Sequence, residues 1–381
     1  MSERTIYLDY NATTPIDPEV ADAMRPCLEG YFGNPSSVHS FGIRAREALE
    51  RARTQVADLL NCAPDEIIFT SGGTESNNLA IGGIALANRA KGHHIITSSI
   101  EHPAVTEVCR YLESKGFRIT VLPVDEEGRV DPGQLERALT PETILVTVMH
   151  ANNEVGTIQP IAEIAAIAAK RGIPVHTDAA QSVGKIPVDV ERLGVALLSV
   201  AGHKLYAPKG VGALYLRRGV AIEKLMHGAA HERNLRPGTE NILEIVGLGK
   251  ACEIAKRDMV HNQAHMKAMR DRLVRRLREG LPAIRINGHP AHCLPNTLSV
   301  GIPGIDASLL PGELQDVALS AGSACHAGET SISPVLKAMK VPPDTARGTL
   351  RISTGRMTTE EEIDKAADLI LRKISEKRTS P

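Results

Sequence analysis

Short apolar segments alternate with helical patterns from about residue 60 to residue 216, and this alternation is the strongest constraint on the fold. The apolar segments predict strands at 66–70, 94–97, 118–122, 144–149, 174–177, 197–200 and 213–216. Between them the pattern predicts helices at 77–89, 104–115, 131–139 and 161–171. We therefore predict an α/β fold in which a mostly parallel, seven-stranded sheet is covered by helices on both faces.

A long charged helical pattern, roughly 244–279, follows the sheet and leads into a second, smaller α+β domain. Strands are predicted there at 283–286, 297–300 and 349–352. The sequence Thr358-Thr359-Glu360-Glu361 predicts the capped start of a last helix. We expect a large domain over residues 16–255 and a small domain formed by residues 1–15 and 256–381.

Composition excludes several classes of function. The 381-residue chain has a net charge of -1 and 3% aromatic residues, which argues against nucleic acid or an anionic membrane as a partner. No apolar run reaches the roughly 18 residues of a membrane span, and Met1–Thr5 carry no apolar signal core, so we expect a cytoplasmic protein. The six cysteines are scattered without a CxxC pair, so neither a metal site nor a disulfide framework is predicted.

Two charged residues follow predicted strands of the sheet. Asp178 ends the segment 173–178, and Lys204 ends the segment 199–204. Ligands of open parallel sheets bind at the carboxyl ends of the strands. A lysine that forms a Schiff base and a carboxylate that keeps a pyridine nitrogen protonated are what a pyridoxal phosphate (PLP) enzyme needs. A structural salt bridge between the two residues is the competing interpretation.

A glycine-rich turn, Ser71-Gly72-Gly73-Thr74, joins a predicted strand to a predicted helix. Such a turn presents backbone N–H groups at the positive end of a helix, which suits a phosphate. The alternative is a tight turn in which Thr74 caps the helix. Because Lys204 and Asp178 are also present, phosphate binding is the favoured interpretation.

Three more polar side chains follow predicted strands. His102 could stack on a planar ring and transfer protons, or it could cap a helix. Asn153 and Gln181 could hydrogen-bond the phenolic oxygen of a pyridoxal ring, or they could satisfy nearby backbone groups.

Cys325 and Arg351 are candidates in the second domain. Cys325 lies among small residues and glycines, a composition suited to a mobile loop that carries a thiolate into a cleft. Cys109 and Cys252, by contrast, lie in helical patterns that suit buried cysteines. Arg351 could clamp a substrate carboxylate with two hydrogen bonds, or it could form an ordinary ion pair.

Taken in order, these segments resemble the cysteine desulfurases of the NifS/IscS type, within the class V aminotransferase family of fold-type I PLP enzymes. The resemblance covers nearly the whole chain. It is carried by residues 7–15, 33–37, 70–76, 101–102, 152–154, 176–181, 202–204, 232–239 and 322–325.

The resemblance implies a role for each cofactor residue. Lys204 would bond covalently to PLP, Asp178 would pair with the pyridine nitrogen and His102 would stack on the ring. Gln181 and Asn153 would contact the ring oxygen. The phosphate would be held by Gly73, Thr74 and His203, and by Thr239 supplied from a second subunit, because the family members are homodimers with composite sites.

The resemblance also implies the reaction. Asn34 and Arg351 would bind the carboxylate of L-cysteine, Lys204 would remove its α-proton, and the Cys325 thiolate would take its sulfur as a persulfide. Alanine would leave, and the sulfur would pass to an acceptor such as an iron–sulfur cluster scaffold or a tRNA-thiolation protein. His102 is a candidate proton shuttle.

Two positions depart from the pattern of the family. Ala201 stands where many relatives carry Ser, and His326 stands where NifS/IscS members usually carry Thr. The Cys-His pair resembles selenocysteine lyases, so that activity is the closest alternative. An aminotransferase would need no thiol, and a non-catalytic binding module would be expected to lose Lys204 or Cys325.

Overall fold

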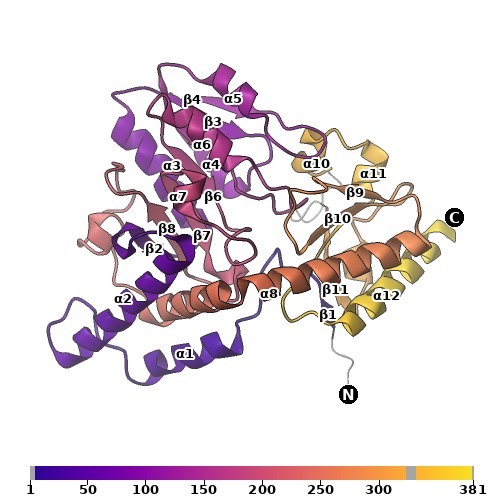
Figure 1. Cartoon of the computed structure of the whole chain (residues 1–381), viewed down its shortest axis with the longest axis horizontal. Coiled ribbons are helices and arrows are strands. Elements are labelled where there is room, and N and C mark those ends of the chain that lie inside the picture. Colours follow the sequence, from indigo (N-terminus) through magenta and orange to yellow (C-terminus); the bar gives the residue numbers. More distant parts are fainter. Residues whose placement is uncertain (1–4, 323–331, 380–381) are drawn as a thin grey trace.

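The computed structural model describes residues 5–322 and 332–379. A seven-stranded sheet forms the larger part of it, with the strand order β2-β8-β7-β6-β5-β3-β4 (Figure 1). Its strands are β2 (Ile67–Thr70), β3 (His94–Ser98), β4 (Arg118–Leu122), β5 (Thr143–Thr147), β6 (Val175–Asp178), β7 (Leu197–Ala201) and β8 (Gly212–Leu216). All seven coincide with predicted strands, and the mostly parallel sheet is confirmed.

One strand of this sheet runs against the others. β8 pairs antiparallel with both β7 and β2, whereas β4, β3, β5, β6 and β7 pair parallel. Because two reversals restore the direction, β2 points the same way as β7. The carboxyl ends of six strands therefore lie at one edge of the sheet.

Both faces of the sheet are covered, so six of its strands are buried along almost their whole length, whereas the edge strand β4 is partly exposed. Neighbouring residues alternate between two cores: Ile68 and Leu197 pack on one face, and Phe69 and Leu198 pack on the other. The first face is covered by α3 (Gly73–Asn88) and α4 (Pro103–Ser114). The second is covered by α1 (Pro18–Glu29), α2 (Ser40–Leu60), α5 (Pro132–Ala138), α6 (Ile161–Ala169) and the first half of α8 (Ile242–Gly280).

A second, antiparallel sheet has the order β12-β13-β10-β9. Its strands are β9 (Arg285–Asn287), β10 (Thr297–Gly301), β12 (Ser320–Ala321) and β13 (Thr349–Ser353). β1 (Ile6–Tyr7) pairs in parallel with β11 (Val317–Ala318) beside it. The sequence did not predict β1, β11 or β12, because a two-residue strand is too short to show a period.

Short helices complete the chain. They are η1 (Pro64–Glu66), α7 (Val190–Leu193), η2 (Gly202–Lys204), η3 (Glu232–Asn234), α9 (Leu310–Glu313), α10 (Pro334–Ala338) and α11 (Pro343–Arg347). The last helix, α12 (Glu360–Thr379), begins where predicted, but its capping box lies one residue later than the predicted segment 358–361. Thr359 Oγ1 accepts from the Glu362 N–H, and Glu362 Oε2 accepts from the Thr359 N–H. None of the helices in the described part is both long and apolar enough to span a membrane.

The 39-residue helix α8 belongs to both parts of the molecule (Figure 1). Leu248 and Ala251 in its first half pack into the core of the large sheet. Leu273 and Leu277 in its second half pack under the second sheet, against α12. The helix therefore fixes the two sheets relative to each other.

Candidate active site

A cavity of about 210 Å³ lies at the edge of the large sheet where the parallel strands end. Asp178 is the last residue of β6, Lys204 follows β7, His102 follows β3, and the glycine-rich turn follows β2. The cavity is lined by Ala12, Gly73, Thr74, Asn77, His102, Ala104, Met149, Ala151, Asn153, Asp178, Ala180, Gln181, Ala201, His203 and Lys204. The fold thus brings together eight residues predicted from the sequence, namely Gly73, Thr74, His102, Asn153, Asp178, Gln181, His203 and Lys204.

Lys204 has the amine expected of a nucleophile. Burial lowers its pKa to about 8, against the opposing influence of Asp178. Its Nζ makes no hydrogen bond or ion pair with any residue that the structure describes. The competing interpretation, a structural salt bridge with Asp178, is therefore not what the described residues form.

Asp178 is held in place by two donors. Asn77 Nδ2 donates to Oδ2 at 2.7 Å, and the Ala180 N–H donates to Oδ1 at 2.9 Å. Asn77 was not predicted from the sequence, although it lies one helical turn after Thr74 and so on the same side of α3. Its buried Oδ1 has no hydrogen-bond partner within the described residues.

The glycine-rich turn opens α3 without a side-chain cap, so N–H groups of its first turn face the cavity edge unopposed. Gly72 has a φ of 152°, which favours glycine. A Cβ on Gly73 would meet the Ala201 Cβ at 3.2 Å, so the two small residues leave the floor of the cavity open. His203 lies beside them, with Nδ1 3.2 Å from Thr13 Oγ1.

This donor set fits PLP. An uncapped 16-residue helix end suits the phosphate, and Asp178 suits a protonated pyridine nitrogen. The free Lys204 amine suits an aldehyde.

His102 is the N-cap residue of α4 and is held there as a neutral ring. Its Nδ1 accepts from the Ala104 N–H at 3.1 Å, so the neutral ring carries its proton on Nε2. Burial, with Lys204 as a secondary cause, lowers the pKa of His102 below its usual value. Next to it, burial raises the pKa of Glu101 to about 8, and that carboxyl accepts from the Met149 N–H at 2.9 Å.

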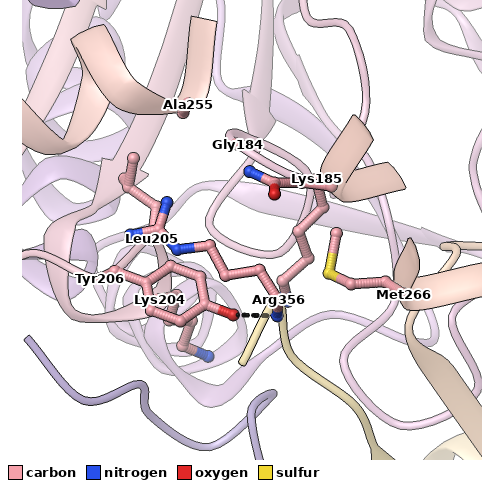
Figure 2. A pocket seen from close by; sticks show the side chains of 9 residues that line it. Gly184, Lys185, Lys204, Leu205, Tyr206, Ala255, Met266 and Arg356 are labelled. Atoms are coloured by element: carbon pink, nitrogen blue, oxygen red, sulfur yellow. Dashed lines mark hydrogen bonds between the residues drawn. The ribbon is translucent and has the colours of Figure 1, made fainter. Parts of the chain in front are cut away.

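A strained turn presents Lys204 to the cavity. Tyr206, two residues on, has a φ of 66°, and its N–H donates to Thr14 Oγ1 at 2.8 Å. Its hydroxyl accepts from the Arg356 N–H at 2.9 Å, and the Arg356 guanidinium lies 4.0 Å from the centre of its ring (Figure 2). These contacts surround a second cavity of only about 10 Å³ behind Lys204, which is too small for a substrate.

Arg351 lies in β13, 4% exposed, and points one edge of its guanidinium at Asp9. Its Nη2 donates to Asp9 Oδ1 at 2.8 Å and to Ser320 Oγ at 2.9 Å. Its buried Nε–H has no acceptor among the described residues. An unpaired guanidinium N–H is a ready site for a carboxylate.

Three predicted site residues in the described part of the chain do not line this cavity, namely Asn34, Thr239 and Arg351. Asn34 is exposed, and its Oδ1 accepts from the Ser36 N–H at 2.9 Å. Thr239 is exposed as well. Cys325, with its neighbour His326, lies outside the described residues.

Comparison with known proteins places this geometry among PLP enzymes. A family model described as class-V aminotransferase matches residues 6–366. A cysteine desulfurase IscS of Dictyoglomus turgidum is 48% identical over 379 residues, which cover 99% of this chain and 96% of that protein. The human cysteine desulfurase is 45% identical over 98% of this chain and 83% of its own length.

Solved structures agree. A NifS-like protein superposes with a TM-score of 0.91 at 40% identity, covering 97% of this chain and 99% of that one. A second structure, SspA in complex with cysteine, superposes with a TM-score of 0.83 at 38% identity, covering 93% and 100% of the two chains.

Proposed function

We infer that this chain, which belongs to the class-V aminotransferase family, is a PLP-dependent cysteine desulfurase that converts L-cysteine to L-alanine. The observation that carries this conclusion is a Lys204 amine with no partner in the described ranges, in one cavity with a fixed Asp178. The chain aligns over nearly its whole length with cysteine desulfurases. The names of these relatives favour a desulfurase over the selenocysteine lyase that the Cys-His pair suggested.

We propose that the residues of the large cavity hold the cofactor. Lys204 would bond to it covalently, Asp178 would pair with its pyridine nitrogen, and His102 would cover its ring. When bound, PLP supplies a covalent link to the substrate amine and a ring that withdraws electrons from Cα. Ala201 leaves one phosphate contact of the family unfilled, so Thr74 and His203 would carry more of that binding.

The chain's own groups would handle the substrate's carboxylate and protons. Arg351, held by Asp9, has an Nε–H with no acceptor among the described residues, and this group would bind the carboxylate. Lys204, whose pKa burial lowers to about 8, would take the α-proton of the substrate and return it to the product. His102, whose Nδ1 is occupied by the Ala104 N–H, would use its Nε2 as the proton shuttle for the substrate thiol.

The sulfur step is assigned to Cys325. Its thiolate would attack the sulfur of the substrate: a Cys325 S–S bond forms, the C–S bond of cysteine breaks, and its electron pair returns to the carbon skeleton that leaves as alanine. The persulfide would pass to an acceptor protein, such as an iron–sulfur scaffold or a tRNA-thiolation protein.

We further propose a homodimer, in which Thr239 of each chain reaches the phosphate of the other. The exposure of Thr239 on its own chain supports this assignment. We also propose that the chain divides into a large domain, residues 16–255, and a small domain formed by residues 1–15 and 256–381. The cytoplasmic location stays a prediction.

The proposed function is tested by incubating the yellow holoprotein with L-cysteine and a reductant, and measuring alanine and sulfide. We expect the two products in a one-to-one ratio, with L-selenocysteine assayed in parallel. Turnover of selenocysteine alone would restore the lyase interpretation, and keto-acid formation without sulfide would point to an aminotransferase.

The lowered pKa of Lys204 predicts how fast the apoprotein captures PLP. Only the neutral amine attacks an aldehyde, and burial brings its pKa from 10.5 to about 8. Below about pH 8 the capture rate should therefore rise about tenfold for each pH unit, and above it the rate should level off. Stopped-flow absorbance at about 420 nm measures this. A midpoint near the usual lysine value would contradict the assigned role of burial.

A further inference from the structure

A second buried lysine, Lys185, lies directly behind the wall of the large cavity. It is 4% exposed, and its Nζ donates to Gln181 Oε1 at 2.9 Å and to Asn11 Oδ1 at 3.0 Å. It forms no ion pair with a carboxylate in the described ranges. Burial lowers its pKa well below the usual value, and the charged groups that act on it, Lys204 and Arg351, are both cations that lower the pKa further.

Burying a lysine without a counter-ion costs folding free energy. An apolar side chain of the same length would fill this space at a lower cost. The presence of Lys185 therefore calls for a contribution other than stability, and its two hydrogen bonds show where that contribution acts.

The local backbone sets Lys185 against Gln181. Residues 180–185 form successive turns, in which the Val183 N–H donates to the Ala179 carbonyl and the Ile186 N–H donates to the Ser182 carbonyl. Residues four apart on such turns lie on the same side. Gly184, with a φ of 80°, completes the turn where a Cβ would meet the Leu205 side chain at 3.2 Å.

Lys185 determines which way the Gln181 amide points. Lys185 donates to Oε1, and Gln181 Nε2 donates to the Asn11 carbonyl at 3.0 Å. If the Gln181 amide were flipped, its NH₂ group would face the N–H groups of Lys185. Its Oε1 would then face the Asn11 carbonyl oxygen. Of the two Nε2 hydrogens, one is used by Asn11, so the other is left for the cavity that Gln181 lines.

Asn11 extends this arrangement into the second sheet. Its Oδ1 also accepts from Asn296 Nδ2 at 3.0 Å. Its Nδ2 donates to Thr297 Oγ1 at 2.8 Å and to the Asn153 carbonyl at 3.2 Å. The Asn11 amide therefore uses all its hydrogen-bonding groups, which makes it a rigid second support for Lys185.

We propose that Lys185 is a positioning residue that fixes the Gln181 amide so that one of its N–H groups faces the ring oxygen of the bound cofactor. The inference rests on the proposed function in taking PLP as that cofactor. It assigns to Lys185 no contact with substrate and no proton transfer.

The variant Lys185→Met keeps the length of the side chain and removes both hydrogen bonds. Without them the Gln181 amide can rotate, so we expect PLP to dissociate about tenfold more readily from the variant. The pH titration of the visible absorption of bound PLP should also shift, because the donor at the ring oxygen sets that equilibrium. The Tm of the apoprotein should stay equal or rise, because a buried amine is removed.

The control is Lys170→Met, the same change at an exposed lysine, which should alter none of these quantities. A double-mutant cycle with Gln181→Met identifies the route of the effect. If Lys185 acts through Gln181, Lys185→Met should change PLP affinity and absorption little once Gln181 is already Met.

Three outcomes decide the inference. Normal PLP affinity and absorption in Lys185→Met overturn it. So does an undiminished effect in the Gln181→Met background, or a lowered Tm that accounts for the weaker binding. Should the Met variant not fold, Lys185→Gln, which keeps a shorter donor, is expected to lose affinity by a smaller factor and is judged by the same cycle. Failure of the wild-type protein to bind PLP would instead overturn the proposed function.

Discussion

Lys204→Ala is expected to lower the turnover of L-cysteine by at least about 10³-fold. In the proposed function the variant loses both the covalent link to the cofactor and the base for the α-proton, and a positioned base alone contributes roughly 10²–10⁴-fold. The buried Lys185 is not expected to replace it, because its Nζ is engaged by Gln181 and Asn11. Two measurements check this: sulfide release, and exchange of the substrate α-proton with D₂O. Both should be lost.

A matched control separates this effect from a general change of charge. Lys209 lies five residues further along the chain and is exposed, so Lys209→Ala should retain both activities. PLP should still bind Lys204→Ala without a covalent link, through the α3 end and Asp178. Proton exchange at the wild-type rate in Lys204→Ala would show that another group is the base.

Cys325→Ala is expected to abolish sulfide release while it leaves the α-proton exchange within roughly twofold of the wild-type rate. Cys325 lies outside the described residues, so this expectation rests on the balance of the reaction. The thiolate accepts the sulfur only after the α-proton has left, so removing it blocks the C–S cleavage and not the earlier step.

Cys27→Ala is the matched control, because Cys27 is a half-buried free cysteine in the large part of the molecule. It should release sulfide normally. Loss of proton exchange together with sulfide release in Cys325→Ala would place Cys325 at an earlier step, and retained sulfide release would remove it from the reaction.

Most of the large sheet could be predicted because most of its strands are buried on both faces and most alternate with α-helices along the chain. The residues at the carboxyl ends of those strands, such as Asp178 and Lys204, could be predicted for the same reason: topology alone brings them to one edge. The short strands β1, β11 and β12 could not, since each is formed by pairing across the chain.

The supports of the site were harder to predict than the site itself. Asn77 lies inside a helix and Lys185 inside a series of turns, where neither has a local sequence signal. Their importance is visible only through the partners that the fold brings to them, Asp178 and Gln181. Asn34 shows the converse: a motif named it, and the described structure leaves it exposed beside its own loop.

The pairing of β1 with β11 has a consequence for synthesis on the ribosome. Asp9 meets its partners Ser320 and Arg351 across 311 and 342 residues of sequence. Asp9 is therefore translated early but gains these partners late. It waits until almost the whole chain has been made before it can pair with Arg351, the residue proposed to bind the substrate carboxylate. Chains that terminate before residue 351 would keep Asp9 but lack Arg351, so a truncated product should be unable to bind the substrate carboxylate in the proposed way.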